Sequence, residues 1–244
     1  MVRDKEKEIQ AYLENMYKRM SWGYDWKAID QYRYKHYIRL MERYLKRKKR
    51  RILEIGCASG TFTEKLYYIN TNNEIVSVDV ACGAIEKAKE RELPVDFRKD
   101  SLPKLHVKGK FDLVLTFEVL SYIKEKTEEA LDTIQKRMKQ NGFWIMSVVV
   151  NEGESYFDEK EIVRQVTEKF EIIYKEDLHF NLYRKLVGKC WNKSFWTEWD
   201  SKIEKNIVRA VMKNRLLPVL CQYIAQLVAP EKYKSHIILV CKKK

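Results

Sequence analysis

Short apolar runs alternate with amphipathic segments along the middle of the chain. Runs rich in β-branched and aromatic residues are typical of buried strands, and they are expected at Arg51–Gly56, Glu74–Asp79, Val95–Arg98, Phe111–Phe117 and Gly142–Val150. Apolar residues spaced by three and four positions predict the intervening helices, at Thr61–Tyr68, Gly83–Arg91 and Glu125–Gln140. This alternation favours an α/β fold with a doubly wound, mostly parallel sheet.

Further elements are expected on both sides of this alternation. Helical spacing predicts N-terminal helices over Lys5–Met20 and about Ala28–Arg47. After residue 151 the expected elements are a helix near Asp158–Lys169, a strand near Phe170–Asp177, an aromatic and basic stretch to about Trp199, a helical region from about Lys202 to Val228 and a last strand at Ser235–Cys241. The roughly 57 residues between the last two strands exceed an ordinary connection and indicate a lid or substrate-binding insertion.

Positive charge is concentrated at the two ends of the chain. The 244 residues carry a net charge of +13, of which residues 1–50 hold +8, residues 51–150 none and residues 151–244 +5. The 45% hydrophobic content excludes a disordered chain. A neutral middle between basic ends indicates a self-contained core whose flanking elements meet an anionic partner. For the run Lys46–Arg51 alone, a solvated helix end is the more ordinary interpretation.

The cysteines and the N-terminus indicate a cellular compartment. The five cysteines are scattered and contain no C-x-x-C pair, so they resemble neither a zinc site nor a disulfide framework, and no metal site is expected. Charged residues stand where a signal peptide would carry its apolar region. No apolar run is long enough to span a bilayer. We therefore expect a cytoplasmic protein with reduced thiols.

The strongest local motif lies where the first expected strand meets the next helix. The sequence Leu53–Gly60 reads LEIGCASG, and its small residues let a ligand approach the backbone at a helix N-terminus. A dinucleotide fingerprint would place its third glycine one residue later, at Thr61. The spacing E-x-G-x-(G/A)-x-G instead resembles motif I of class I S-adenosyl-L-methionine-dependent methyltransferases. The resemblance continues to about Phe180 and the last strand, and it implies a seven-stranded Rossmann-like sheet.

The resemblance implies a set of cofactor-binding residues after successive strands. Motif I would hold the methionine end of S-adenosylmethionine through Glu54, Gly56 and Gly60 and the backbone of Cys57 and Ala58. Asp79 would accept both ribose hydroxyls, as a carboxylate can accept two hydrogen bonds at once. The adenine would lie against Val80 and near Asp100, Ser101 and Leu102, and the E-x-L-x-x-I motif after the fourth strand adds Phe117, Glu118 and Tyr122. Each carboxylate alone could instead cap a helix or turn.

The resemblance and the flanking composition also suggest substrate-side residues. Ser121 and Tyr122 replace the histidine that many relatives carry, so His179, just after the sixth strand, becomes the candidate base. N-terminal aromatic residues would cover the cofactor in such a family; they are Trp22, Tyr24, Trp26 and Tyr32, with Arg33 beside them. In the insertion, Tyr183, Arg184, Trp191 and Trp196 are candidates for substrate binding. The mixture of aromatic and basic residues there would also suit a nucleic-acid surface or a basic patch that faces a membrane. Ordinary packing is an alternative role for all of these side chains.

These features predict a domain plan and three competing functions. Residues 1–50 would form a helical cover, 51–180 the S-adenosylmethionine-binding core, 181–234 a helical lid and 235–244 the final core strand. The leading function is methyl transfer to an O or N atom of a small, anionic metabolite. An RNA methyltransferase is the second, although the chain lacks an N-P-P-Y-type tetrad, and a non-catalytic cofactor-binding scaffold is the third. The acceptor atom and the oligomeric state stay open.

Overall fold

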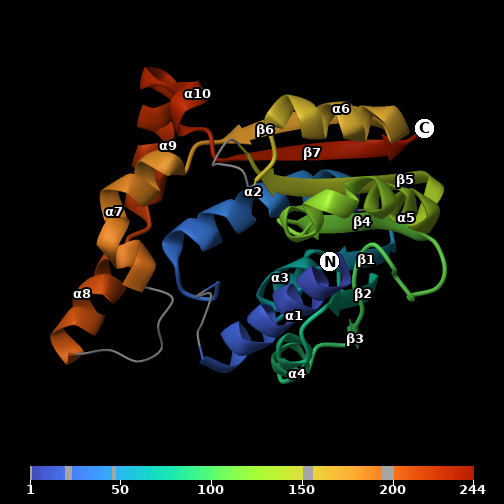
Figure 1. Cartoon of the computed structure of the whole chain (residues 1–244), viewed down its shortest axis with the longest axis horizontal. Coiled ribbons are helices and arrows are strands. Elements are labelled where there is room, and N and C mark those ends of the chain that lie inside the picture. Colours follow the sequence, from blue (N-terminus) through green and yellow to red (C-terminus); the bar gives the residue numbers. More distant parts are fainter. Residues whose placement is uncertain (1, 20–23, 46–47, 151–155, 194–200) are drawn as a thin grey trace. The chain divides into compact units, whose positions relative to one another are not determined.

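A computed structural model describes residues 2–19, 24–45, 48–150, 156–193 and 201–244 (Figure 1). The described helices are α1 (Val2–Arg19), α2 (Ala28–Leu45), α3 (Thr61–Ile69), α4 (Cys82–Lys89), the 3-10 helix η1 (Leu120–Lys126), α5 (Thr127–Arg137), α6 (Glu159–Lys169), α7 (Asn181–Lys193), α8 (Lys202–Lys213), α9 (Leu216–Val228) and α10 (Pro230–Tyr233). The described strands are β1 (Arg51–Ile55), β2 (Glu74–Asp79), β3 (Asp96–Lys99), β4 (Phe111–Phe117), β5 (Met138–Val149), β6 (Phe170–Leu178) and β7 (His236–Lys243). Within these residues the chain forms two compact units.

The larger unit, residues 42–177 and 235–244, contains the sheet. Its seven described strands have the order β3-β2-β1-β4-β5-β7-β6. Strands β1 to β5 pair in parallel, and β7 pairs antiparallel with β5. This arrangement confirms the expected Rossmann-like fold with a mostly parallel seven-stranded sheet.

Helices cover both faces of this sheet. Successive side chains of a strand point to opposite faces. On β1, Leu53 belongs to the apolar core that also contains residues of α5 and α6, whereas the neighbouring Glu54 bonds Thr63 of α3. The sheet is therefore doubly wound, and the carboxyl ends of its parallel strands meet at one edge, where such folds bind ligands.

The smaller unit, residues 1–41 and 178–234, is helical. It combines most of the segment expected as an N-terminal cover with the segment expected as a lid. Its core includes Tyr37 and Met41 of α2, Tyr183 of α7 and Met212 of α8, which are fully buried. Two distant parts of the sequence thus fold together as one body.

Several elements differ from those expected. The helix expected to run to Gln140 ends at Arg137, because Met138 already pairs with Phe111 of β4 ahead of a register shift. The helical region Lys202–Val228 is two helices. The side chain of Asn214 accepts hydrogen bonds from the backbone of Leu216 and Leu217 at 3.0 and 3.1 Å and starts the second helix. The first part of the expected aromatic and basic stretch is α7.

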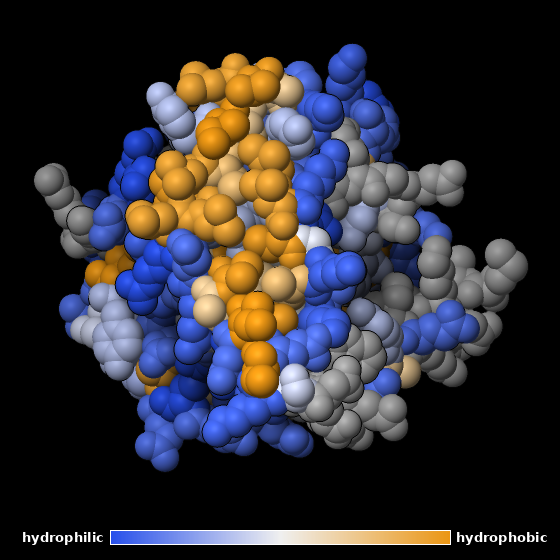
Figure 2. Space-filling model, turned by 90° about the vertical axis from the view of Figure 1, so that its left-hand side faces the viewer, coloured by the Kyte–Doolittle hydropathy of each residue, from blue (hydrophilic) through white to orange (hydrophobic). Residues whose placement is uncertain are grey.

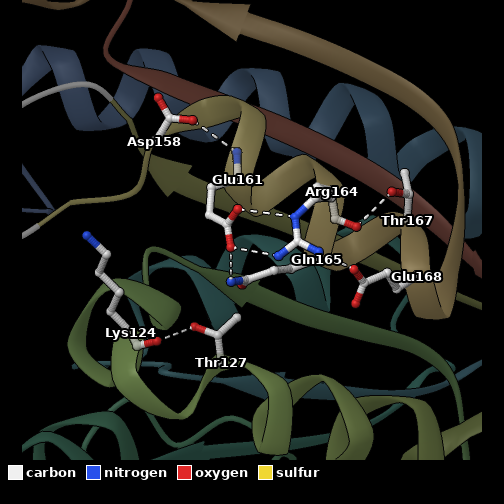
Figure 3. A network of polar contacts seen from close by, with 8 residues as sticks. All are labelled: Lys124, Thr127, Asp158, Glu161, Arg164, Gln165, Thr167 and Glu168. Carbon is white, nitrogen blue, oxygen red and sulfur yellow. Dashed lines mark hydrogen bonds and ion pairs between the residues drawn. The ribbon is translucent and has the colours of Figure 1, made fainter.

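Helix α6 shows how exposed polar residues fix a helix start (Figure 3). The side chain of Asp158 accepts a hydrogen bond from the backbone N–H of Glu161 at 3.0 Å, which satisfies one of the unpaired donors of the first turn. Glu161 in turn binds Arg164 and Gln165. The hydrogen bonds to Arg164 and Gln165 lower the pKa of Glu161.

Replacing Asp158 by alanine should destabilise the protein modestly. Losing an N-cap side chain costs about 1 kcal/mol of unfolding free energy, which urea denaturation can measure. Lys160→Ala is a suitable control, since Lys160 is an exposed residue of the same helix turn. Equal stabilities for the two variants would contradict the capping role.

Candidate functional site

The loop after β1 wraps tightly through left-handed backbone conformations. The φ angles are +82° at Gly56, +49° at Ala58 and +74° at Gly60. The backbone N–H groups of Gly56 and Cys57 both donate to the carbonyl of Val78, at 2.7 and 3.0 Å, so the loop is fixed against the end of β2. The loop leads directly into α3, whose N-terminus carries a partial positive charge suited to anionic groups.

Arg91, just after the C-terminal end of α4, holds the same loop. Its guanidinium donates to the carbonyl of Ser59 at 2.6 Å, to Glu64 at 2.7 Å and to the hydroxyl of Thr61 at 3.0 Å. Sequence reasoning missed this residue. Its partners are local to the loop in space but about 30 positions away in sequence, so no motif spacing reveals the role.

Asp79, at the end of β2, connects two loops. Its Oδ2 accepts the backbone N–H of Ala58 at 2.9 Å, and its Oδ1 accepts that of Ala81 at 3.0 Å. The residue is 8% exposed. A carboxylate offers about four acceptor positions, so either oxygen can also accept a ligand hydroxyl. The position expected to hold a ribose therefore has suitable chemistry.

Asp100, after β3, organises its own loop. Its carboxylate accepts the backbone N–H groups of Ser101, His106 and Val107 at 2.9, 2.7 and 2.8 Å, and the His106 Nδ1 lies 2.9 Å from its Oδ1. Four donors match the usual capacity of a carboxylate. The carboxylate thus fixes the loop that presents Ser101, while Leu102 belongs to the apolar core. A contact of Asp100 with an adenine amino group stays a prediction.

Glu54 is buried beneath the loop between β1, β2 and α3. Its Oε2 accepts the hydroxyls of Thr63 at 2.6 Å and Ser77 at 2.7 Å. Burial raises the pKa of Glu54 from 4.5 to about 7, against the opposing effect of these two hydrogen bonds. Glu54 therefore links three elements under the loop, and its charge state changes near neutral pH.

This raised pKa predicts a pH-dependent stability. The folded chain favours the protonated form of the Glu54 carboxyl. The contribution of Glu54 to the free energy of unfolding is therefore complete below its ordinary pKa of 4.5, and it is lost as the pH rises through about 7. Relative to Glu54→Gln, the cofactor-free wild type should lose about 3 kcal/mol of unfolding free energy between pH 4.5 and pH 8. Denaturation curves at several pH values measure it.

A matched variant on the surface controls for this measurement. Glu86→Gln removes a carboxyl from the exposed face of α4 and should follow the wild type at every pH. If the unfolding free energies of the wild type and of Glu54→Gln changed in parallel with pH, the raised pKa of Glu54 would be refuted.

The end of β4 supplies a strained turn whose carboxylate lies near a histidine of β7. Glu118 has a φ of +62°, which is rare for a residue with a side chain. Its Oε1 lies 3.5 Å from Nε2 of His236, the first residue of β7. The ring of Phe117 packs edge-on against that of Phe62, and Tyr122 is 40% exposed. Such outliers are typical of functional sites.

His236 was placed in a strand by sequence reasoning and was not chosen as a candidate. The topology of the sheet could have indicated this residue. An antiparallel final strand begins at the edge where the parallel strands end, so its first residue lies at the ligand-binding edge; here Val149 of β5 pairs with His236.

The expected N-terminal aromatic residues lie in the smaller unit. The ring of Tyr24 packs near Tyr34, and that of Tyr32 contacts His36 and Phe180. Arg33 is buried and pairs with Asp30 at 2.8 Å, and Trp26 lies beside Lys27. Trp22 lies outside the described residues. Cofactor contacts by Tyr24 and Tyr32 stay predictions.

The other expected substrate-side residues also belong to the smaller unit. His179 is 4% exposed; its backbone N–H donates to Gln222 Oε1 at 2.6 Å, and its Nδ1 lies 3.4 Å from Gln222 Nε2. Tyr183 is buried with its hydroxyl 3.7 Å from the sulfur of Met212, and burial raises its pKa. Arg184 lies half-buried in α7. The Trp191 side chain and all of Trp196 lie outside the described residues.

The residues around the carboxyl edge fit S-adenosylmethionine. The loop offers backbone groups close to a carboxylate that can accept ribose hydroxyls, and the half-buried Val80, Ser101 and Glu118 follow neighbouring strands. The thiol of Cys57 is buried and its pKa is well above the ordinary value, because burial disfavours the thiolate. Cys57 therefore contributes backbone rather than nucleophilic chemistry here.

Comparisons with known proteins agree with this fit. The family model described as nodulation protein S (NodS) matches residues 5–155. The chain is similar to a malonyl-[acyl-carrier protein] O-methyltransferase of Bacillus cytotoxicus, with 28% identity over 58% of this chain and 51% of the relative. It is also similar to nodulation protein S of Azorhizobium caulinodans, with 33% identity over 38% of this chain and 46% of the relative. The chain thus spans about half the length of the curated relatives it matches.

A solved structure extends the likeness in fold to nearly the whole chain. The N-methyltransferase NodS from Bradyrhizobium japonicum WM9, in complex with S-adenosyl-L-homocysteine, superposes with a TM-score of 0.64 at 15% identity. The superposition covers 96% of this chain and 97% of that one. The predicted resemblance to class I S-adenosylmethionine-dependent methyltransferases is confirmed.

Proposed function

The chain belongs to the nodulation protein S family, and from this premise we propose that it is an S-adenosylmethionine-dependent methyltransferase acting on an N or O atom of a small, anionic molecule. The names of similar proteins include both O- and N-methyltransferases, so the proposal covers both acceptor atoms. We further propose that it works in the cytoplasm with reduced thiols. All five cysteines lie in the described residues, and the structure joins none of them in a disulfide.

The observation that carries the proposal is the contact of Asp79 with the loop after β1. One carboxylate holds the backbone of Ala58 at 2.9 Å and can accept two ribose hydroxyls beside it. The left-handed residues Gly56 and Gly60 bring the backbone close enough for the amino-acid end of the cofactor. When bound, S-adenosylmethionine would supply a methyl group on a sulfonium; an amine or hydroxyl lone pair would bond that methyl carbon in line while its bond to sulfur breaks and neutral S-adenosylhomocysteine leaves.

Glu118 and His236 are our candidates for the groups that remove the proton from the acceptor atom. A histidine beside a carboxylate is a suitable general base, and the pair lies at the edge where β4 and β5 end. His179 is the alternative. Its ring lies beside Gln222, with 3.4 Å between His179 Nδ1 and Gln222 Nε2.

The anionic character of the substrate rests on charge. Residues 1–50 carry +8 and residues 151–244 carry +5, whereas residues 51–150, which contain most of the cofactor loops, are neutral. A field of one sign raises the local concentration of oppositely charged ligands. We therefore expect acceptors with a phosphate or carboxylate to be used better than their neutral counterparts.

Two measurements test the proposal. Isothermal titration calorimetry with S-adenosylhomocysteine tests cofactor binding, and methyl transfer from radiolabelled S-adenosylmethionine tests the activity. Acceptors are compared in pairs, ethanolamine with phosphoethanolamine and catechol with dihydroxybenzoate. His236→Ala and His179→Ala are assayed in parallel, and the base is the residue whose loss lowers turnover while cofactor affinity is kept.

Each result leads to a definite conclusion. Cofactor binding with turnover of an acidic acceptor supports the proposal, and a preference for the neutral member of a pair overturns the anionic part. Turnover of mixed tRNA, with binding that falls steeply with salt, would identify the RNA alternative instead. Cofactor binding without turnover of any acceptor would favour a scaffold, and absence of cofactor binding would refute the proposal as a whole.

A further inference from the structure

Helices α8 and α9 of the smaller unit expose an unusual amount of apolar surface. Figure 2 shows a continuous apolar band on this side of the molecule, bordered by hydrophilic residues. The exposed apolar residues of α7, α8 and α9, which we call the apolar face, are Leu186, Ile203, Ile207, Leu216, Val219, Leu220, Tyr223, Ile224, Leu227 and Val228, each between 41% and 74% exposed. Large exposed apolar patches mark interaction sites.

Helix α9 turns its larger apolar residues outward. Its buried residues are Pro218, Cys221, Gln222 and Ala225, which are small or polar. Its exposed side carries leucines, Ile224 and Tyr223. A helix that packs only against its own protein shows the opposite arrangement. The outward side therefore has the composition of a buried surface, although in the described part of the chain it is exposed.

Positive charge borders the apolar face. Residues 181–234 contain eleven Lys and Arg residues and four Asp and Glu residues. Exposed cations of α8 and of the turn before α9 include Lys202, Arg209, Lys213 and Arg215. In the described part of this segment the acidic residues are Glu204 and Glu231, and they pair with Lys193 and Lys234. The border thus presents a net positive field around apolar side chains.

We propose that the apolar face binds the surface of a membrane that contains anionic lipids. Apolar side chains of an amphipathic helix enter the boundary between headgroups and acyl chains, and flanking Lys and Arg residues bind anionic headgroups. Among the described helices, none has the length and apolar character needed to cross a bilayer, so the binding is interfacial. The long cationic side chains can reach headgroups while their stems lie on apolar surface.

Charge complementarity favours a membrane over a second copy of the chain. A symmetric dimer through this face would bring the same basic border against itself, and like charges across an interface are unfavourable. An anionic bilayer complements both features of the apolar face. Its apolar layer can bury the apolar side chains, and its negative charge can pair with the basic residues. The proposal is independent of the methyl-transfer activity.

Vesicle sedimentation with the full chain tests this inference. The probes are vesicles of phosphatidylcholine alone and of phosphatidylcholine with phosphatidylglycerol. The wild type should bind the anionic vesicles about tenfold or more tightly than the neutral ones, and high salt should weaken the binding. The double variant Leu220→Glu/Ile224→Glu should abolish binding, and Lys202→Glu/Lys213→Glu should weaken it about tenfold or more.

Matched variants elsewhere keep the test specific. Tyr68→Glu changes an exposed aromatic residue of α3, and Lys108→Glu/Lys110→Glu makes the same charge change in an exposed loop of the larger unit; both should bind vesicles like the wild type. Circular dichroism verifies that each variant is folded. If Leu220→Glu/Ile224→Glu does not fold, Leu220→Ser replaces it.

Several outcomes would overturn the inference. They are no binding to anionic vesicles, equal binding by neutral and anionic vesicles, or binding that survives the apolar variants. A concentration-dependent dimer in sedimentation velocity that Leu220→Glu/Ile224→Glu dissolves, without vesicle binding, would assign the face to a second copy instead.

Discussion

Asp79→Ala is expected to weaken S-adenosylhomocysteine binding about 100-fold or more. The variant loses an acceptor for two ribose hydroxyls, and hydrogen bonds to a charged group contribute about 1.5–3 kcal/mol each. It also releases the backbone N–H groups of Ala58 and Ala81, which the carboxylate holds at 2.9 and 3.0 Å. Both losses act on the same site, so the effect exceeds that of an ordinary surface change. Isothermal titration calorimetry measures it.

Two further variants separate charge from shape. Asp79→Asn keeps the volume but turns an amide N–H₂ toward a backbone donor, so its affinity should also fall strongly. Asp96→Ala removes a carboxylate from neighbouring β3, where it pairs with Arg98, and should bind like the wild type. If folded Asp79→Ala binds within about threefold of the wild type, Asp79 does not hold the ribose.

Gly56→Ala should destabilise the protein by about 2–4 kcal/mol and impair cofactor binding. A Cβ at this position would lie 2.3 Å from Cγ2 of Val119, and the backbone φ of +82° is unfavourable for alanine. The loop cannot relax freely, because Gly56 and Cys57 are both bonded to Val78. Denaturation curves and calorimetry measure the two effects.

The clash and the backbone strain can be measured separately. Adding Val119→Ala to Gly56→Ala removes the clashing atom, since the next nearest atom, Cβ of Val119, lies at an ordinary 3.7 Å. The double variant should recover at least 1 kcal/mol relative to the sum of the single changes. Gly109→Ala is the control for strain alone, because its φ is +95° but its close neighbour is the end of the flexible Arg51 side chain. No recovery in the double variant would exclude the clash as the cause.

Local pattern predicted the parallel core well. The strands Glu74–Asp79 and Phe111–Phe117 begin and end where their apolar runs do, because strands buried on both faces need continuous apolar residues. The family resemblance rested on small residues around Gly56, whose left-handed backbone the structure shows. Where a structural element depends on local spacing, the sequence was sufficient to predict it.

Roles that depend on long-range packing were harder to predict. Arg91 binds Ser59 across 32 positions, and His236 meets Glu118 only because β7 runs antiparallel beside β5. Asp100 is predicted to be an adenine ligand, and no motif in the sequence predicts the four donors that its own loop supplies. The break at Asn214 was hidden because apolar spacing continues across it. For Arg91 and His236 a tertiary contact decided the outcome, and for Asp100 and Asn214 the local fold of the backbone decided it.

The position of β7 bears on how the protein is made. This strand is the last in the sequence, yet it lies inside the sheet between β5 and β6. During synthesis one edge of β5 stays unpaired with β7 until residues 236–243 have left the ribosome. More than 80 residues of intervening chain emerge before them. Unpaired edges pair readily with other chains. The nascent protein therefore passes through a stage in which holdase chaperones that cover exposed strand edges would raise its yield.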